Sequence, residues 1–165
     1  MGAVPMRWDG RAVPLSEARL LGPRDIVDRA AHEPILGGVT WPESWHLDRS
    51  GAFQCGHRGS TLESARTWAD DPRSLLRTRR EGLSSPEGCP PDWLIIDSRP
   101  RAMWGGEPIG EADARAYLLI RSALAAVGVR LLDLMIFDDD RNWWSIGQLL
   151  SGHGCQHPLD SWPEP

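Results

Sequence analysis

Cysteine and histidine alternate at two places in the chain, and such spacing suits the ligation of zinc. The candidate ligands are Cys55 and His57, then His153, Cys155 and His157, with Cys89 as an isolated addition. Alternate residues of a strand point to the same side, so each extended group would present its nitrogen and sulfur ligands together. Structural zinc sites more often use Cys-x-x-Cys spacing, so exposed histidines and buried thiols are the competing interpretation.

Two runs of charged residues have structural interpretations that involve no ligand. Residues 73–80 hold several arginines, which can contact phosphates, but acidic neighbours balance them as on a solvated helix face. Residues 138–140 are three aspartates that lack the spaced ligands and the distal glutamate of a calcium loop. We therefore expect an exposed helix face in the first run and a hairpin turn in the second.

The clearest structural elements lie in the second half of the chain. Residues 93–96 form a short apolar run between prolines, which predicts a buried strand. Residues 111–127 have apolar side chains at helical spacing, and Gly128 stands where a left-handed helix cap belongs. Strands are predicted at 131–137 and 143–145, on either side of the acidic turn. The apolar stripe of the helix is predicted to contain Ala112, Ala116, Leu119, Ile120, Ala123, Leu124 and Val127.

Earlier in the chain the pattern predicts a helix followed by strands. Pro23 suits the first turn of a helix that runs to His32, and Pro34 disfavours helical backbone in the residue before it. Strands are predicted at 35–41 and 44–48, and a turn at 49–51 leads into a returning strand at 52–57. A broken helix over 62–80 and a proline-rich loop over 82–91 follow.

The order of elements around Asp97-Ser98-Arg99 resembles the end of a JAB/MPN domain of the RadC-like type. In that family the strand ends in a His-x-His-Pro zinc motif, and the next helix opens with Ser-x-x-Asp. Here the histidine positions are Asp97 and Arg99, the serine position is Gly110, and the aspartate position is Asp113. The resemblance implies an α/β (α+β) fold in which helices flank a curved mixed sheet, as in the cytidine-deaminase-like architecture.

The resemblance also implies which residues would do chemistry. Active members hold zinc with two histidines and an aspartate, and a glutamate activates the bound water. Carried over, Asp97 and Asp113 are the metal positions, and Glu43 or Glu33 is the candidate catalytic base. Arg99 cannot ligate a metal because its guanidinium stays protonated and has no lone pair.

Arg99 is therefore expected to neutralise the former metal site. Its planar guanidinium suits a carboxylate partner, so it would pair with Asp97 or Asp113. Gly110 also lacks the hydroxyl that would support a developing charge. The alternative is that residues 97–100 form an ordinary exposed turn.

Composition bounds the remaining possibilities. The 165 residues fit one domain (23–150) with an N-terminal arm (1–22) and a C-terminal tail (151–165). A net charge of −5 gives no general reason to expect nucleic-acid binding, and the odd count of three cysteines disfavours a disulfide framework. All 18 basic residues are arginine, which is typical of a GC-rich bacterial genome. No secretory signal and no apolar run of roughly 20 residues is visible, so a cytoplasmic protein without a membrane partner is expected.

Three functions are compatible with the sequence. The first is a degenerate JAB/MPN domain, a pseudoenzyme without a cofactor, that binds a protein partner through sheet edges and a tryptophan-rich surface. The second is a metal-dependent hydrolase or isopeptidase in which zinc is held by Asp97, Asp113 and either His46 or His57. The third is a small defence or mobile-element protein that binds a nucleoprotein complex, with nucleic acid as the weaker partner.

Overall fold

The computed structural model describes most of the chain. The described residues are 5–8, 11–14, 18–32, 42–59, 64–71, 90–99, 109–138, 140 and 142–164. The candidate residues Glu33 and Cys89, the predicted strand at 35–41 and the arginine run at 73–80 lie outside them.

A five-stranded mixed sheet forms the centre of the fold, with the strand order β4-β3-β5-β6-β7. Its strands are β3 (Glu43–Leu47), β4 (Phe53–Arg58), β5 (Asp92–Ser98), β6 (Arg130–Phe137) and β7 (Trp143–Ser145). β5 and β6 are parallel, and the other neighbouring pairs are antiparallel. Because parallel strands need a crossover connection, a helix lies between β5 and β6 in the chain.

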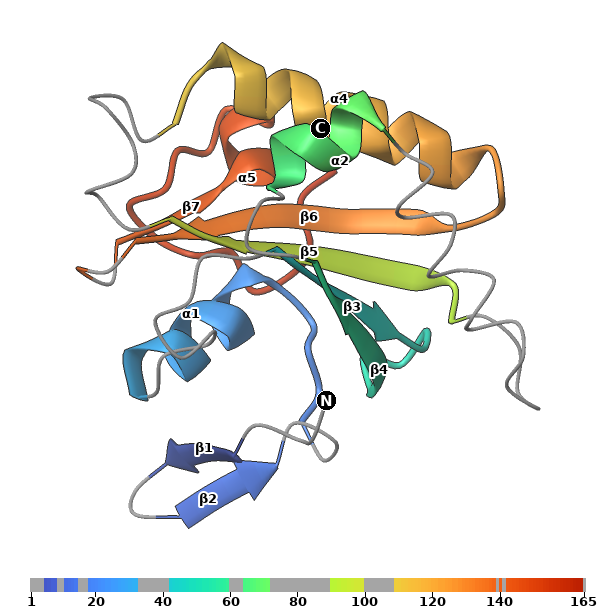
Figure 1. Cartoon of the computed structure of the whole chain (residues 1–165). Helices are drawn as coiled ribbons and strands as arrows, with labels where there is room; N and C mark the ends of the chain where they lie inside the picture. The colour runs from blue at the N-terminus through green and yellow to red at the C-terminus, as the bar shows by residue number, and fades with distance from the viewer. Residues whose placement is uncertain are drawn as a thin grey trace.

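Helices cover both faces of this sheet (Figure 1). On one face lies α1 (Pro23–His32), and on the other lie α2 (Ala65–Asp70), α4 (Glu111–Ala125) and α5 (Ile146–Leu150). A separate antiparallel hairpin consists of β1 (Pro5–Trp8) and β2 (Arg11–Pro14). The predicted mixed α/β class with a helix-flanked sheet is therefore confirmed. No described helix has the length and apolar character that crossing a membrane would require.

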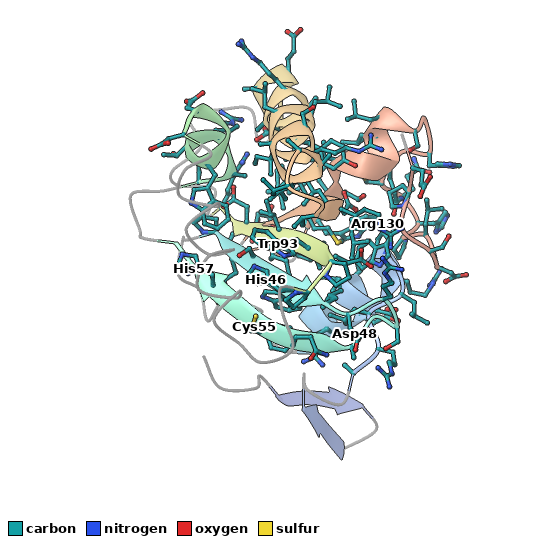
Figure 2. All side chains as sticks on the ribbon, turned by 90° about the vertical axis from the view of Figure 1, so that its right-hand side faces the viewer. His46, Asp48, Cys55, His57, Trp93 and Arg130 are labelled. Atoms are coloured by element: carbon teal, nitrogen blue, oxygen red, sulfur yellow. The ribbon has the colours of Figure 1, made fainter. Side chains whose placement is uncertain are left out.

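The β3–β4 hairpin forms where the sequence predicted it (Figure 2). Asp48 Oδ1 accepts the backbone N–H of Ser50 at 2.8 Å and that of Ala52 at 3.1 Å. Gly51 has a φ of +82°, a left-handed conformation that glycine adopts without steric cost. The turn thus fixes the register in which β4 returns along β3.

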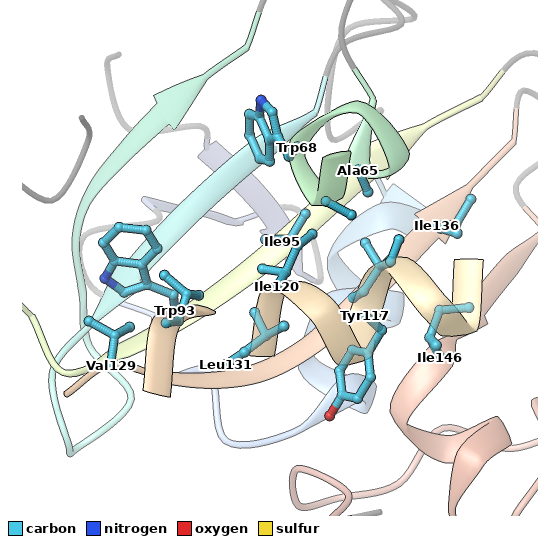
Figure 3. Packing of buried hydrophobic residues seen from close by; sticks show 14 residues of the cluster. Ala65, Trp68, Trp93, Ile95, Tyr117, Ile120, Val129, Leu131, Ile136 and Ile146 are labelled. Atoms are coloured by element: carbon cyan, nitrogen blue, oxygen red, sulfur yellow. The ribbon is translucent and has the colours of Figure 1, made fainter. Parts of the chain in front are cut away.

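The core has two parts, one on each face of the sheet. Along β5, Trp93 and Ile95 pack toward α2 and α4 (Figure 3). Leu94 and Ile96 pack on the opposite face. A strand that is buried on both faces is apolar throughout instead of alternating. This explains why residues 93–96 form an unbroken apolar run.

The buried face of α4 is rotated from the predicted stripe. Its buried side chains are Asp113, Ala116, Tyr117, Ile120 and Leu124. Leu119 was expected in the core but is 44% exposed, and the neighbouring Leu118 is 47% exposed. Spacing alone did not decide which leucines face the sheet, because Tyr117 and the polar Asp113 take part of the inward face.

Candidate functional site

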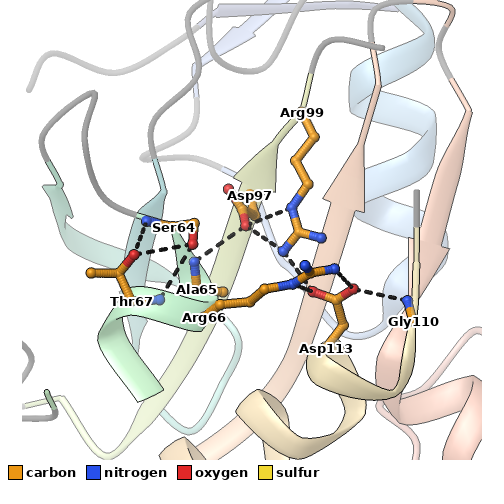
Figure 4. Close-up of polar contacts among 8 residues, drawn as sticks. All are labelled: Ser64, Ala65, Arg66, Thr67, Asp97, Arg99, Gly110 and Asp113. Carbon is orange, nitrogen blue, oxygen red and sulfur yellow. Dashed lines mark hydrogen bonds and ion pairs between the residues drawn. The ribbon is translucent and has the colours of Figure 1, made fainter. Parts of the chain in front are cut away.

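Asp97, Arg99 and Asp113 converge at the carboxyl end of β5, the middle strand of the sheet (Figure 4). Asp97 lies near the end of β5, and Asp113 lies in the first turn of α4. The backbone N–H of Arg99 donates to the Phe137 carbonyl at 2.8 Å, which anchors the start of the loop beside β6. The carboxyl end of β5 and the amino end of α4 therefore present their charged side chains to each other.

One guanidinium nitrogen bridges the two carboxylates. Arg99 Nη2 lies 2.9 Å from Asp97 Oδ2 and 2.7 Å from Asp113 Oδ1. Arg99 Nε also donates to Asp97 Oδ2 at 3.1 Å. The predicted pairing of Arg99 is present, and it involves both aspartates. Asp97 is 2% exposed and belongs to β5 together with Ser98, so the described residues 97–99 do not form the exposed turn of the alternative interpretation.

A second arginine, which the sequence analysis missed, completes the cluster. Arg66, on α2, donates from Nε to Asp113 Oδ1 at 3.0 Å and from Nη2 to Asp113 Oδ2 at 2.7 Å. Nothing local in the sequence indicates this contact, because α2 and α4 are separated by a long segment and meet only in the folded chain. We call Asp97, Arg99, Arg66 and Asp113 the ion-pair cluster.

Backbone amides satisfy further acceptors of the cluster. The N–H of Ala65 donates to Asp97 Oδ2 at 3.2 Å, and the N–H of Gly110 donates to Asp113 Oδ2 at 3.1 Å. Ser64 caps α2 by accepting the Thr67 N–H at 3.3 Å. Each aspartate thus holds a helix start in place as well as an arginine.

The ion-pair cluster favours the ionised form of the Asp113 carboxyl group. Burial alone would raise the pKa of Asp113, but hydrogen bonds from Arg66 and Arg99 outweigh it and lower the pKa to about 2. Burial raises the pKa of Asp97 against the opposing charge of Arg99. Burial opposes the charge of Arg99, but its bonds to Asp113 and the charge of Asp97 raise its pKa above the ordinary value. Arg99 is therefore a permanent cation in this site.

Glu43 is not brought to the ion-pair cluster. It lies opposite Ile96 in the β3–β5 register, and its carboxylate accepts the Trp45 Nε1–H at 2.8 Å. Neighbouring residues of a strand point to opposite faces, so Asp97 faces the other side of the sheet from Ile96 and Glu43. The sheet separates this candidate base from the two candidate metal positions.

The described cysteine and histidine candidates do not gather around one point, and Cys89 lies outside the described residues. Within the described part of the chain, no group of three or more His, Cys, Asp or Glu residues is placed to hold a metal. Cys155 accepts the Ser145 N–H at 3.3 Å, while His153 and His157 are exposed in the tail. Cys55 and His57 lie on β4, where Cys55 meets His46.

The acidic turn also has a structural explanation. Asp138 Oδ1 accepts the backbone N–H of Asp140 at 3.0 Å and that of Asn142 at 2.8 Å. These bonds close the connection between β6 and β7. The predicted hairpin turn is confirmed at these residues.

Comparison with known proteins adds no relative: no protein-family model matches the chain, and no curated protein matches it significantly. The candidate site is therefore interpreted from its own geometry. It consists of two carboxylates and two guanidinium groups whose formal charges sum to zero. Such a cluster can stabilise the junction of β5, α2 and α4, but its charged groups are already engaged with one another.

Proposed function

We propose that this chain is a catalytically degenerate JAB/MPN-like domain of the RadC type that acts by binding another protein. The observation that carries the proposal is the position of Arg99 Nη2, which lies within 2.9 Å of Asp97 and 2.7 Å of Asp113. In the family that the sequence resembles, the corresponding positions surround a metal cation. Here an internal cation of the protein lies between the two carboxylates.

The chemistry of the residues opposes a zinc hydrolase at this place. A catalytic zinc needs three protein ligands and one open position for water. Arg99 offers no lone pair, and a metal would have to displace it from both carboxylates. Asp113 would also have to give up its bidentate bonds with Arg66. The arrangement therefore favours a retained scaffold over a metalloenzyme.

A regenerated metal site tests the proposal. The variant with Asp97→His, Arg99→His and Arg66→Ala restores two histidines beside Asp113 and removes both guanidinium groups. We expect about one zinc per chain in this variant and none in the wild-type protein, measured by elemental analysis after zinc loading and dialysis. The matched control adds Asp113→Asn, which should abolish the zinc.

Two outcomes contradict the proposal. Stoichiometric zinc in the wild-type protein that disappears in Asp113→Ala would support the hydrolase alternative instead. A regenerated variant that folds, as circular dichroism can establish, but takes up no zinc would remove the proposed correspondence with the JAB/MPN metal positions.

The described tryptophans contribute little exposed surface. Trp45, Trp68 and Trp93 are buried core residues, and Trp143, Trp144 and Trp162 are partly buried. The side chains of Trp8, Trp41 and Trp104 lie outside the described part of the chain, so the tryptophan-rich binding surface stays a prediction. Leu118 and Leu119 instead stand side by side on the outer face of α4, beside Ala114 and Arg115 in a shallow hollow. Contiguous exposed apolar patches mark contact surfaces, and we propose this face of α4 as the binding face.

Paired substitutions test this surface. We expect Leu118→Asp with Leu119→Asp to abolish a photo-crosslink between Arg115, replaced by a photoreactive residue, and a cellular protein. Leu21→Asp changes a leucine that is 55% exposed elsewhere, so it should leave the crosslink intact. A crosslink that survives the double substitution would rule out α4 as the binding face.

A further inference from the structure

A second group of reactive side chains lies on the β3–β4 hairpin, away from the ion-pair cluster (Figure 2). His46 and Cys55 are register partners on the two antiparallel strands, so their side chains share one face of the sheet. Cys55 Sγ lies 3.3 Å from His46 Nδ1, within hydrogen-bond reach for sulfur. The strand register shifts directly after His46, and irregularities of this kind re-aim side chains at functional sites.

His46 is held rigidly behind the thiol. Its Nε2 lies 3.0 Å from Ser44 Oγ, and its ring stacks on Trp93 with centroids 4.0 Å apart and planes 11° apart. The imidazole is 2% exposed, whereas Cys55 is exposed. The hairpin thus presents a thiol to solvent and places a ring nitrogen within hydrogen-bond distance on its inner side.

The protonation of His46 suits the role of a hydrogen-bond donor to the Cys55 thiolate. Burial, together with the nearby charge of His57, lowers the pKa of His46 to about 4, so the imidazole is neutral near pH 7 and carries one ring proton. When the Ser44 hydroxyl donates to Nε2, that proton stands on Nδ1, which donates to Cys55 Sγ. A hydrogen bond to the charged form of a group favours that form, so this arrangement favours the Cys55 thiolate.

Cys155 provides a comparison, because its sulfur bonds to backbone groups and not to an imidazole. Its sulfur accepts the Ser145 N–H at 3.3 Å and donates to the Ser145 carbonyl at 3.5 Å. Burial raises the pKa of the Cys155 thiol, which disfavours the thiolate that reacts. Cys155 therefore serves as the reference thiol for the reactivity of Cys55.

We propose that Cys55, His46 and Ser44 form a reactive-thiol site that takes a disulfide as its substrate in thiol–disulfide exchange. The Cys55 thiol releases its proton to water, the Nδ1–H of His46 donates to the resulting thiolate, and Cys55 Sγ attacks the nearer sulfur of the disulfide. A new S–S bond forms at Cys55 as the old one breaks, and the departing sulfur leaves with the electron pair. The departing thiolate takes a proton from water, so the products are a mixed disulfide and one free thiol.

The test uses full-length protein that carries Cys89→Ser, with oxidised glutathione as the disulfide. Peptide mass spectrometry over time should show Cys55 modified at least about tenfold faster than Cys155. His46→Phe keeps an aromatic ring beside Trp93 but removes the hydrogen-bond donor, and it should slow Cys55 by about tenfold. Ser44→Ala should slow it less, and Gln54→Ala, the matched control at an exposed position of the same strand as Cys55, should leave the rate near that of the parent protein.

Several results would overturn the proposal. Equal rates at Cys55 in the parent protein and in a folded His46→Phe variant would exclude a role for the imidazole, as would equal rates at Cys55 and Cys155. If His46→Phe does not fold, the reaction rate of Cys55 in the parent protein is compared with that of N-acetylcysteine amide at the same pH. A rate that is no faster would show that Cys55 is an ordinary exposed thiol.

Discussion

The buried carboxyl groups of this protein are stabilised in two different ways. Asp97 and Asp113 share the guanidinium of Arg99, so each charge meets an opposite one. Asp133 is fully buried and has no ion pair with another described residue; its carboxylate instead accepts the Ser145 hydroxyl and the N–H groups of Leu134 and Gly147. The first arrangement depends on a permanent charge, whereas the second depends on hydrogen bonds.

Removing Arg99 should therefore be costly. Arg99→Ala leaves Asp97 without its cation in a site that is closed to water, and we expect the free energy of unfolding to fall by about 3–5 kcal/mol. Arg66→Ala is the matched comparison, since Arg66 is 44% exposed and Asp113 keeps Arg99; a loss of about 1 kcal/mol is expected. Urea unfolding measures both. Equal losses would contradict the central position assigned to Arg99.

Asp133 should make stability depend on pH. Burial raises its pKa to about 7, although the bonds from Ser145, Gly147 and Leu134 oppose that rise. Since the ordinary value is 3.8, the folded chain holds a proton between these limits that the unfolded chain has released. Its contribution to stability is present below about pH 4 and is lost as the pH rises through about 7.

Asp133→Asn isolates this contribution. The amide keeps the shape of the carboxyl group but does not titrate. The difference in the free energy of unfolding between Asp133→Asn and wild type should change between pH 4 and pH 8 and level off above pH 8. Urea unfolding at several pH values measures it. A difference independent of pH would show that Asp133 titrates near its ordinary pKa in the folded chain.

At the scale of elements, the short helix α5 is positioned by a close approach to β6. α5 has five residues and begins at Ile146 beside the buried Asp133. Gly147 lets the helix approach closely, since a Cβ there would lie 2.7 Å from Pro163 Cγ and 2.9 Å from Asp133 Oδ1. The position of α5 thus depends on residue 147 being a glycine, which has no side chain.

Gly147→Ala tests this close approach. Helix propensity alone predicts a stabilisation of about 1 kcal/mol, but the forced displacement of Asp133 and Pro163 should reverse the sign. We expect a loss of about 1–3 kcal/mol in thermal or urea unfolding. Leu149→Ala, at a partly exposed position of the same helix, should be nearly neutral by comparison. A stabilised Gly147→Ala protein would show that α5 can shift freely.

At the scale of the whole molecule, the C-terminal tail joins distant parts of the chain. The Gln148 side chain donates to the carbonyls of Gly154 and His157 and accepts the N–H of Leu159. Further along, Arg24 of α1 pairs with Asp160, and Trp162 Nε1 donates to the Leu20 carbonyl at 3.3 Å. The tail therefore packs against both the helix layer and the beginning of α1.

Gln148→Ala should release the tail. Gln148 is fully buried, so its loss leaves two carbonyls and one N–H without their partner, and we expect about 3 kcal/mol of destabilisation. Limited proteolysis should then cleave within residues 153–162 faster than in the wild-type protein. Gln54→Ala removes a glutamine on the exposed hairpin and is the control, with little change expected. Unchanged protection of the tail would place its anchor elsewhere.

Local patterns predicted many of the elements because their signals are contained in short stretches. Pro23 at a helix start, Gly51 in a turn and Gly128 after α4 each mark a backbone conformation that their own residue type favours. The chemistry of Arg99 was also readable, since no environment gives a guanidinium a lone pair. Leu119 was placed wrongly because helical spacing defines a stripe but not its direction.

The sequence by itself determined the strands and helices of the second half, the polar turns and the inability of Arg99 to ligate a metal. Only the tertiary structure decided which charges meet. Arg66 reaches Asp113 because α2 packs on α4, Glu43 faces away from Asp97 because of the β3–β5 register, and Cys55 meets His46 across the hairpin. Contacts of this kind join residues far apart in the chain, so their identity follows from packing and register and not from local spacing.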